Sequence, residues 1–231
     1  MAEHPSSSHD HRPDFMVTLG LSPPYVLDDV KQAYRDRARE THPDRGGSTA
    51  AFNEVQVAFE RAQAYLEFRG DRRSWIAAKM SRYTELRAAI ERLERFGAVV
   101  TTHAPEWLEN SFGDFAQLSE TARIVRLEQN ADGDAVIRSL VADHHALRDI
   151  ESLALPKCRL TDQAVLSLAP FQQLKHLDLS DTPVTALILD LIDAIESLET
   201  LNLEGTQVGW LAKRGAKARL RRRSLTSDAT F

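Results

Sequence analysis

The feature that most constrains the fold is a repeat in the C-terminal half of the chain. Three segments share one apolar pattern, in which a leucine or isoleucine precedes a Leu-x-Leu pair, and they begin at Ile150, Leu174 and Leu198. They follow one another every 24 residues without a gap. A fixed period of this length is typical of chains that stack one small unit on the next, because neighbouring units bury each other's apolar faces.

Each Leu-x-Leu pair predicts a short strand with its leucines facing inward, and the apolar residues that follow predict a helix or turn on the convex side. The pattern resembles the leucine-rich repeat family, which implies an α/β solenoid that binds proteins. On this resemblance the outward positions of the strands form the partner-binding concave face: Ser152, His176, Asp178, Ser180, Thr200, Asn202 and Glu204. These positions lack the Trp, Tyr and Arg that anchor tight interfaces, so we expect weak or narrow recognition of a folded partner.

The segments flanking the three repeats carry weaker versions of the pattern. Residues 123–127 followed by 135–147 predict an imperfect first unit, with Asp132-Gly133-Asp134 as its turn. A terminal repeat that departs from the pattern of the others is typical of a unit that caps the core of a repeat array. Residues 105–118 predict a short helix whose Trp107, Phe112 and Phe115 form a lid over the open end of that unit.

Cys158 is the only cysteine, so no disulfide can form within the chain, as expected for a reducing compartment. A single cysteine can be a nucleophile or a metal ligand. However, Cys158 shares its repeat column with Thr182 and Thr206, which places it inside the solenoid, and we interpret it as structural.

The N-terminal part contains two helical patterns separated by His42-Pro43-Asp44. Apolar residues recur at three- and four-residue steps on both sides of the tripeptide, which predicts two antiparallel helices. Pro43 ends the first of these helices, and Gly46-Gly47 allows a turn before the next begins near Ser48 or Thr49. Lys31, Arg35 and Arg39 lie four residues apart and form one positive stripe that runs toward the tripeptide.

Together these motifs make residues 13–68 similar to a J-domain, the DnaJ-like module of co-chaperones. The resemblance implies that the tripeptide and the basic helix face dock on a DnaK-class chaperone and stimulate its ATP hydrolysis. The chaperone-binding residues that it implies are Lys31, Tyr34, Arg35, His42, Pro43, Asp44 and Arg45. The alternative is an ordinary charged helix face beside a turn.

Several residues depart from the J-domain pattern. Asp36 and Glu40 stand where members often carry basic residues, Arg37 occupies a usual leucine position, and Val26 replaces a capping Ser or Thr. Loss of that cap costs about 1 kcal/mol, partly offset by Asp28 and Asp29 at the positive end of the helix dipole.

Residues 71–97 predict a long helix that joins the two modules. Its apolar stripe could pair with a second copy in a coiled coil, but the uneven spacing favours packing within the chain. Residues 212–231 form a basic tail with a net charge of +6, whereas the rest of the chain carries −11. Such a tail can bind nucleic acid, but with few aromatic residues it is better explained as solvated or docked on the acidic body.

Residues 1–12 are polar and carry no secretory signal, and we expect them to be a disordered tail; His4, His9 and His11 could hold a metal only loosely. No phosphate-binding glycine loop or catalytic signature is present. We therefore expect no enzyme activity, no catalytic or metal site, no cofactor, no membrane association and a cytoplasmic location.

The sequence thus predicts a multidomain chain, in which an all-α helical hairpin and an α/β solenoid are joined by a long helix. The predicted segments are a tail (1–12), a J-domain (13–70), a helical linker (71–97), a cap region (98–122), repeats (123–211) and a basic tail (212–231). Two functions fit. One is a co-chaperone whose repeats select an unknown protein client. The other is an interaction scaffold whose J-domain no longer activates a chaperone.

Overall fold

The computed structural model describes residues 12–228, with side chains through Arg222. These residues form ten α-helices, three 3-10 helices and a five-stranded mixed sheet, so the protein is a mixed α/β chain. It divides into two compact units: the described residues up to Ala77 with Glu106–Asp114, and Ala78–Pro105 with the described residues from Phe115 onward. The predicted N-terminal tail and its histidines, residues 1–11, lie outside the described residues.

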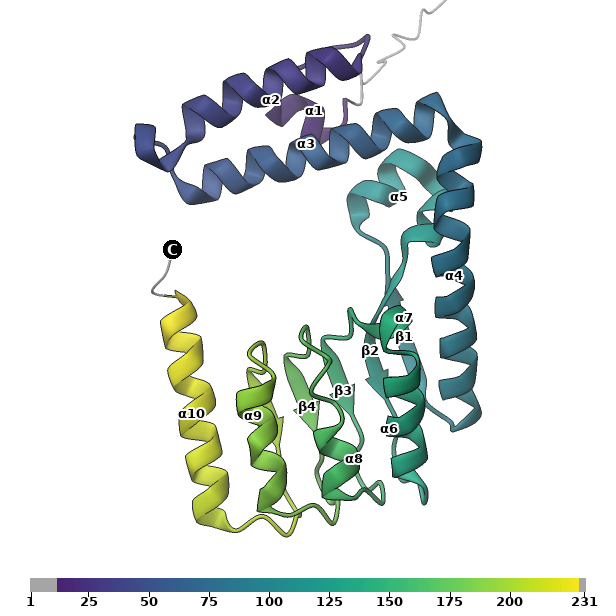
Figure 1. Cartoon of the computed structure of the whole chain (residues 1–231), viewed down its shortest axis with the longest axis vertical. Helices are drawn as coiled ribbons and strands as arrows, with labels where there is room; N and C mark the ends of the chain where they lie inside the picture. Colours follow the sequence, from purple (N-terminus) through teal and green to yellow (C-terminus); the bar gives the residue numbers. More distant parts are fainter. Residues whose placement is uncertain (1–11, 229–231) are drawn as a thin grey trace, which may run out of the picture. The chain divides into compact units, whose positions relative to one another are not determined.

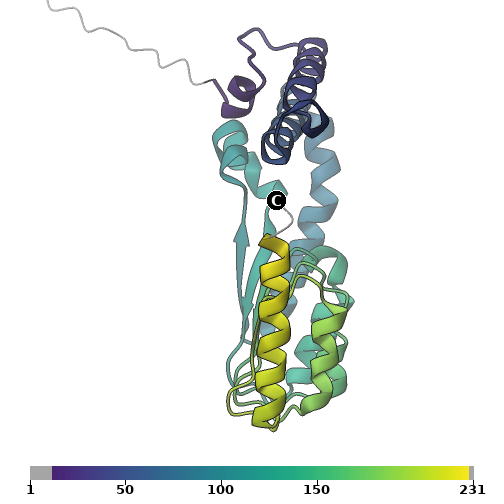
Figure 2. The same cartoon turned by 90° about the vertical axis from the view of Figure 1, so that its left-hand side faces the viewer.

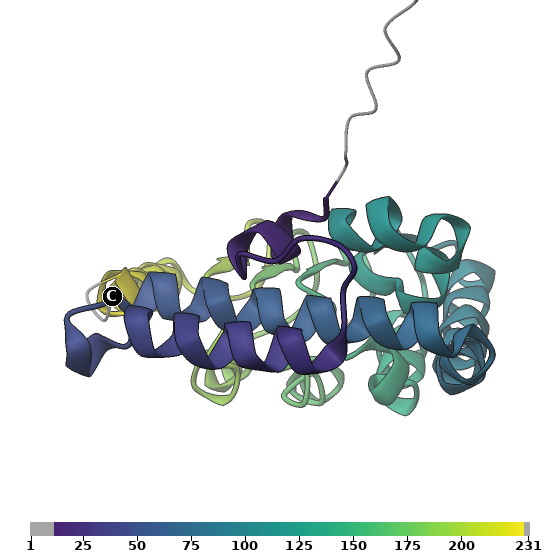
Figure 3. The same cartoon turned by 90° about the horizontal axis from the view of Figure 1, so that it is seen from above.

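The first unit is helical. Helices α2 (Leu27–Thr41) and α3 (Thr49–Gly70) lie side by side, as Figures 1 and 3 show, and η1 (Pro43–Arg45) connects them. The short α1 (Asp14–Thr18) supplies Phe15 and Met16 to their shared core. Val30 of α2 and Val55 and Ala62 of α3 are buried in this core as the apolar stripes predict, whereas Phe59 and Leu66 of the same stripe are only partly buried.

Helix α5 (Glu106–Phe112) also belongs to the first unit. The Trp107 ring meets the Phe15 ring edge-on at 5.8 Å, and the Phe112 ring lies 4.5 Å from that of Phe68. The predicted helix therefore forms, but its predicted role as a lid over the first repeat is wrong for Trp107 and Phe112, because these rings find apolar partners near α1 and α3.

Helix α4 (Arg72–Arg95) begins after Asp71, whose carboxylate accepts hydrogen bonds from the backbone N–H and hydroxyl of Ser74. These bonds, the one from the hydroxyl first, lower the pKa of Asp71. From Ala78 onward α4 belongs to the second unit. Its apolar stripe is buried in that unit's core, so the stripe packs within the chain: Leu86, Ala89, Ile90 and Leu93.

The second unit contains a sheet with the order β1 (Val99–His103), β2 (Thr121–Arg126), β3 (Ser152–Ala154), β4 (His176–Asp178) and β5 (Thr200–Asn202). Strands β2 to β5 are parallel. Ser152 pairs with His176 and His176 with Thr200, so the 24-residue period of the sequence is also the register of the sheet. Strand β1 runs antiparallel to β2 and replaces part of the predicted helical cap region.

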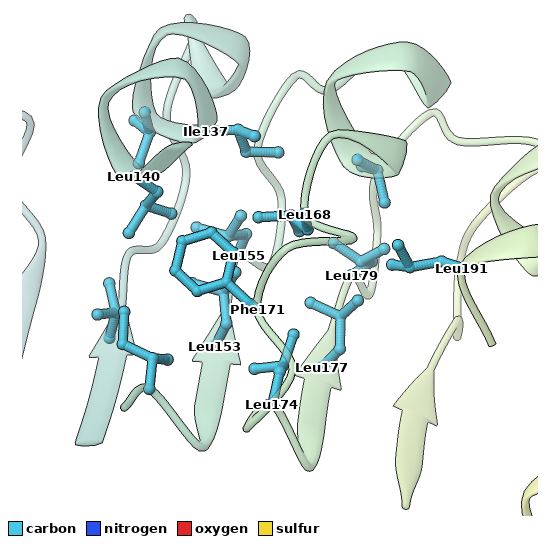
Figure 4. Packing of buried hydrophobic residues seen from close by; sticks show 14 of the residues in the cluster. Ile137, Leu140, Leu153, Leu155, Leu168, Phe171, Leu174, Leu177, Leu179 and Leu191 are labelled. Carbon is cyan, nitrogen blue, oxygen red and sulfur yellow. The ribbon is translucent and has the colours of Figure 1, made fainter. Parts of the chain in front are cut away.

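The helices that follow strands β2, β3 and β4 lie on one side of the sheet, as the colours of Figure 2 allow the reader to follow. They are α6 (Gly133–Ala142), α7 (His144–Leu147), α8 (Asp162–Leu166), η3 (Ala186–Asp190) and α9 (Leu191–Ala194), while η2 (Gly113–Ser119) precedes β2. Figure 4 shows leucines of the strands, such as Leu153 and Leu177, facing Leu168 and Phe171 from the segment that follows β3. The repeat leucines are therefore buried in one core, as the repeat pattern predicts.

A ladder of Asp–Thr contacts links successive helices. The Asp134 carboxylate accepts hydrogen bonds from the backbone N–H and hydroxyl of Thr161, both at 2.8 Å. Asp162 does the same for Thr185 at 2.7 and 2.6 Å. Asp132 caps α6 by accepting from the Ala135 N–H, so of the turn predicted at 132–134 only Asp132 lies in a turn, and Gly133 and Asp134 already begin the helix.

Helix α10 (Trp210–Asp228) follows the last strand. Its Ala216 and Leu220 are buried in the core of the second unit, and the Arg219 guanidinium pairs with the Asp193 carboxylate. The described part of the basic tail is therefore a helix docked on the acidic body. Arg223 belongs to the same basic tail in the sequence, but its side chain is not among those that the structure describes.

Candidate functional site

The His42-Pro43-Asp44 tripeptide forms a tight turn at the end of α2. His42 leaves helical geometry at ψ 130°, and its Nδ1 accepts a hydrogen bond from the Asp44 N–H at 3.1 Å. The edge of its ring meets the Phe52 ring of α3 at 5.6 Å. His42 is thus held against the hairpin, whereas Pro43, Asp44 and Arg45 are exposed.

Two glycines close this turn. Gly46 adopts a φ of +90°, a left-handed conformation that disfavours other residues. The Gly47 N–H donates to the His42 carbonyl at 3.0 Å, and a Cβ atom at Gly47 would lie 2.0 Å from the Thr41 carbonyl oxygen. The geometry of the tip therefore depends on glycine at this position.

The basic face of α2 is partly neutralised by its own acidic residues. Lys31 and Arg35 stand four residues apart, and the Arg35 Nε donates to the Lys31 carbonyl at 3.2 Å. Arg39 lies 3.5 Å from the Asp36 carboxylate, and Arg37 lies 3.3 Å from that of Glu40. All four of these ion-pair side chains are exposed, so each pair contributes little to stability but lowers the local positive charge.

Tyr34 lies on α2, and Val26 is the residue immediately before the helix. The half-buried Tyr34 stacks its ring on that of Phe59 at 4.2 Å, so the ring supports the hairpin and leaves only part of its surface for a partner. Val26 makes no capping hydrogen bond, whereas the Ser48 hydroxyl caps α3 by accepting from the Ala51 N–H.

The second candidate site is the outer face of strands β3 to β5. His176 Nδ1 lies 2.9 Å from the Thr200 hydroxyl, on the neighbouring strand. Two residues further along each strand, Asp178 and Asn202 accept a hydrogen bond from the N–H of Ser180 and Glu204, at 2.9 and 3.1 Å. These local bonds fix the direction of the side chains that end the two strands.

This face forms the floor of a groove of about 790 Å³. Of the predicted partner-binding residues, the groove brings together Ser152, His176, Asp178, Thr200, Asn202 and Glu204, but Ser180 is not in its lining. Sequence reasoning missed one wall of the groove, which helix α10 supplies with Lys213, Lys217 and Arg221. Their four-residue spacing was the available signal, because it places them on one helix face.

The Cys158 thiol is buried and donates a weak hydrogen bond to the Leu127 carbonyl at 3.6 Å. Burial raises the pKa of this thiol, which disfavours the reactive thiolate. The threonines in the same repeat column bond differently, because Thr182 and Thr206 donate to carbonyls within their own turns at 2.6 Å.

Comparison with protein-family models, curated proteins and solved structures finds no match for this chain. Across residues 12–228, no helix combines the length and the apolar character needed to cross a membrane.

Proposed function

We propose that this protein is a J-domain co-chaperone that stimulates ATP hydrolysis by a DnaK-class chaperone. The observation that carries the proposal is the exposed Pro43-Asp44-Arg45 tip, which two glycines and the ring of His42 hold at the end of a two-helix hairpin. A rigid, exposed tip next to a basic helix face suits docking on an acidic partner surface, because little ordering is needed on binding.

In this proposal the second unit is a leucine-rich-repeat module that selects a protein client in the cytoplasm. The parallel register at 24-residue steps and the polar outer face of β3 to β5 support the assignment. The groove, at about 790 Å³, has the size of a site for a short segment of a partner protein.

A specific observation supports the second candidate, a scaffold whose J-domain no longer activates a chaperone. The Asp36 carboxylate pairs with Arg39, which neutralises one residue of the basic stripe that would meet the chaperone, and Glu40 pairs with Arg37 elsewhere on the same helix. In this case the hairpin is a folded module and the sheet unit does the binding.

The deciding experiment is single-turnover ATP hydrolysis by a DnaK-class chaperone with the full chain. We expect stimulation by the wild type and its loss in His42→Gln and in Asp44→Asn. The second variant matters because the Asp44 side chain is 89% exposed, so its exchange leaves the hairpin packing intact. His103→Gln, at an exposed position on β1, is the matched control and keeps full stimulation.

No stimulation by a folded wild type would reject the co-chaperone. The scaffold hypothesis then predicts that Asp36→Lys with Glu40→Lys, which restores the positive face, produces stimulation that the wild type lacks.

A further inference from the structure

The groove of the second unit carries opposite charges on its two sides. Its strand side includes Asp178 at the end of β4, Glu199 just before β5 and Glu204 in the turn after β5, together with one basic residue, Arg126 at the end of β2. Its α10 wall presents Lys213, Lys217 and Arg221. The charge difference between the two sides therefore orients a bound ligand, in addition to the shape of the groove.

The packing of α10 determines which face of the helix lines the groove. Ala216 and Leu220 are buried in the core, and they alternate along the helix with the three basic residues. Because four residues of helix rise about 6 Å, the three basic side chains form a ladder with steps of that length. The Lys213 ammonium also donates to the Thr206 carbonyl at 3.5 Å, which ties the base of the ladder to the turn after β5.

The rest of the chain carries a net charge opposite in sign to that of the α10 wall. Outside residues 212–231 the chain carries 22 basic and 33 acidic residues. The net charge outside the tail is therefore negative, and the α10 wall offers an acidic ligand a positive surface within the second unit.

We propose that the groove binds an acidic segment of a protein partner, whose carboxylates pair with Lys213, Lys217 and Arg221. The floor carboxylates of Asp178 and Glu204 keep the acidic side of the segment turned toward α10. They also disfavour nucleic acid, whose phosphates would meet both sides of the groove. The inference rests on the proposed function of the sheet unit as a client-binding module, and it names the chemistry of that client.

The test is fluorescence anisotropy with the full chain and a labelled nonapeptide, Glu-Ala-Ala-Leu-Glu-Ala-Ala-Leu-Glu. The reference peptides carry glutamine or lysine in place of glutamate. With three partly exposed ion pairs, we expect the glutamate peptide to bind about tenfold tighter than the glutamine peptide at low salt. This preference should shrink as salt is raised.

Three variants locate the binding. Lys217→Glu should abolish the preference for the glutamate peptide, whereas Arg214→Glu, at an exposed position outside the groove lining, should retain it. Asp178→Asn keeps the oxygen that accepts the Ser180 N–H but removes the charge, so it should tighten binding of the glutamate peptide. Circular dichroism of each variant checks that α10 is still folded.

Equal binding of the glutamate and glutamine peptides, or a preference for the lysine peptide, would overturn the proposal. So would tighter binding of a thymidine dodecamer than of any peptide at the same salt, since this would make the groove a nucleic-acid site. The readout needs no chaperone, so a failed groove test is distinct from a failed ATPase test, in which His42→Gln is the diagnostic variant.

Discussion

Gly47 occupies a position with no room for a side chain. The obstructing atom, the Thr41 carbonyl oxygen, belongs to the backbone at the end of α2 and cannot swing aside. We predict that Gly47→Ala lowers the free energy of unfolding of the first unit by about 1–3 kcal/mol. Chemical denaturation followed by tryptophan fluorescence measures this, because Trp75 and Trp107 lie in that unit.

Gly70→Ala is the matched control for this prediction. Gly70 ends α3, and no atom lies within 4 Å of a Cβ placed there, so the substitution should be tolerated. Equal destabilisation by the two variants would show that the close approach to Thr41 does not matter.

The Cys158 thiol should be inert in the folded protein. It is 1% exposed, and burial raises its pKa. We predict that an aromatic disulfide reagent at pH 8 modifies the native thiol on the order of a hundredfold more slowly than the unfolded one. Fast modification without denaturant would instead mark Cys158 as a reactive site.

The same shift gives stability a pH dependence. The unfolded thiol loses its proton near pH 8.5, below the raised pKa of the folded thiol. The resulting contribution to stability is present below about pH 8.5 and is lost as the pH rises toward the folded pKa. Denaturation of wild type and Cys158→Ser at pH 7 and pH 10 tests this, because the stability advantage of the wild type should be smaller at pH 10.

At the scale of elements, the two Asp–Thr contacts hold α6 to the start of α8 and α8 to the start of η3. Asp162→Ala would leave the N–H and hydroxyl of the partly buried Thr185 without their acceptor. We predict a loss of about 2 kcal/mol in the free energy of unfolding of this unit. Asp190→Ala, at an exposed position on η3, is the control and should change stability by less than about 0.5 kcal/mol. Thermal denaturation followed by circular dichroism compares the two variants. Equal losses in the free energy of unfolding would show that the Asp–Thr contacts do not stabilise this unit.

Some elements could be predicted from the sequence because their signal is periodic. The 24-residue repeat placed Ser152, His176 and Thr200 in one row, and the structure pairs them. The α2–α3 hairpin follows in the same way from its apolar stripes and from Pro43.

Other elements depend on tertiary contacts that no local pattern encodes. The β-branched run from Val99 to Thr102 is a usable strand signal, but only pairing with β2 decides that it forms a strand. The aromatic residues of α5 are equally suited to either core, and the structure places them in the first unit. The α10 wall of the groove was missed because a basic helix is usually a solvated one.

At the scale of the whole molecule, the two units have separate cores, one containing Leu19 and the other Leu147. We predict that Leu19→Ala and Leu147→Ala each remove about 2–5 kcal/mol, but from different transitions. Leu19→Ala should shift the transition seen by tryptophan fluorescence, because Trp75 and Trp107 lie in the first unit and Trp210 of the second unit is already exposed. Leu147→Ala should shift a separate transition seen by circular dichroism. If both variants shift both signals equally, the chain unfolds as one cooperative body.

The sheet of the second unit ends differently on its two sides. At one end β1 reverses direction, and at the other α10 packs against β5 with Ala216 and Leu220 in the core. Neither end therefore offers a parallel strand with an open apolar flank on which the next copy could stack. Both ends of the repeat array are thus closed to a further copy, which disfavours end-to-end stacking into filaments.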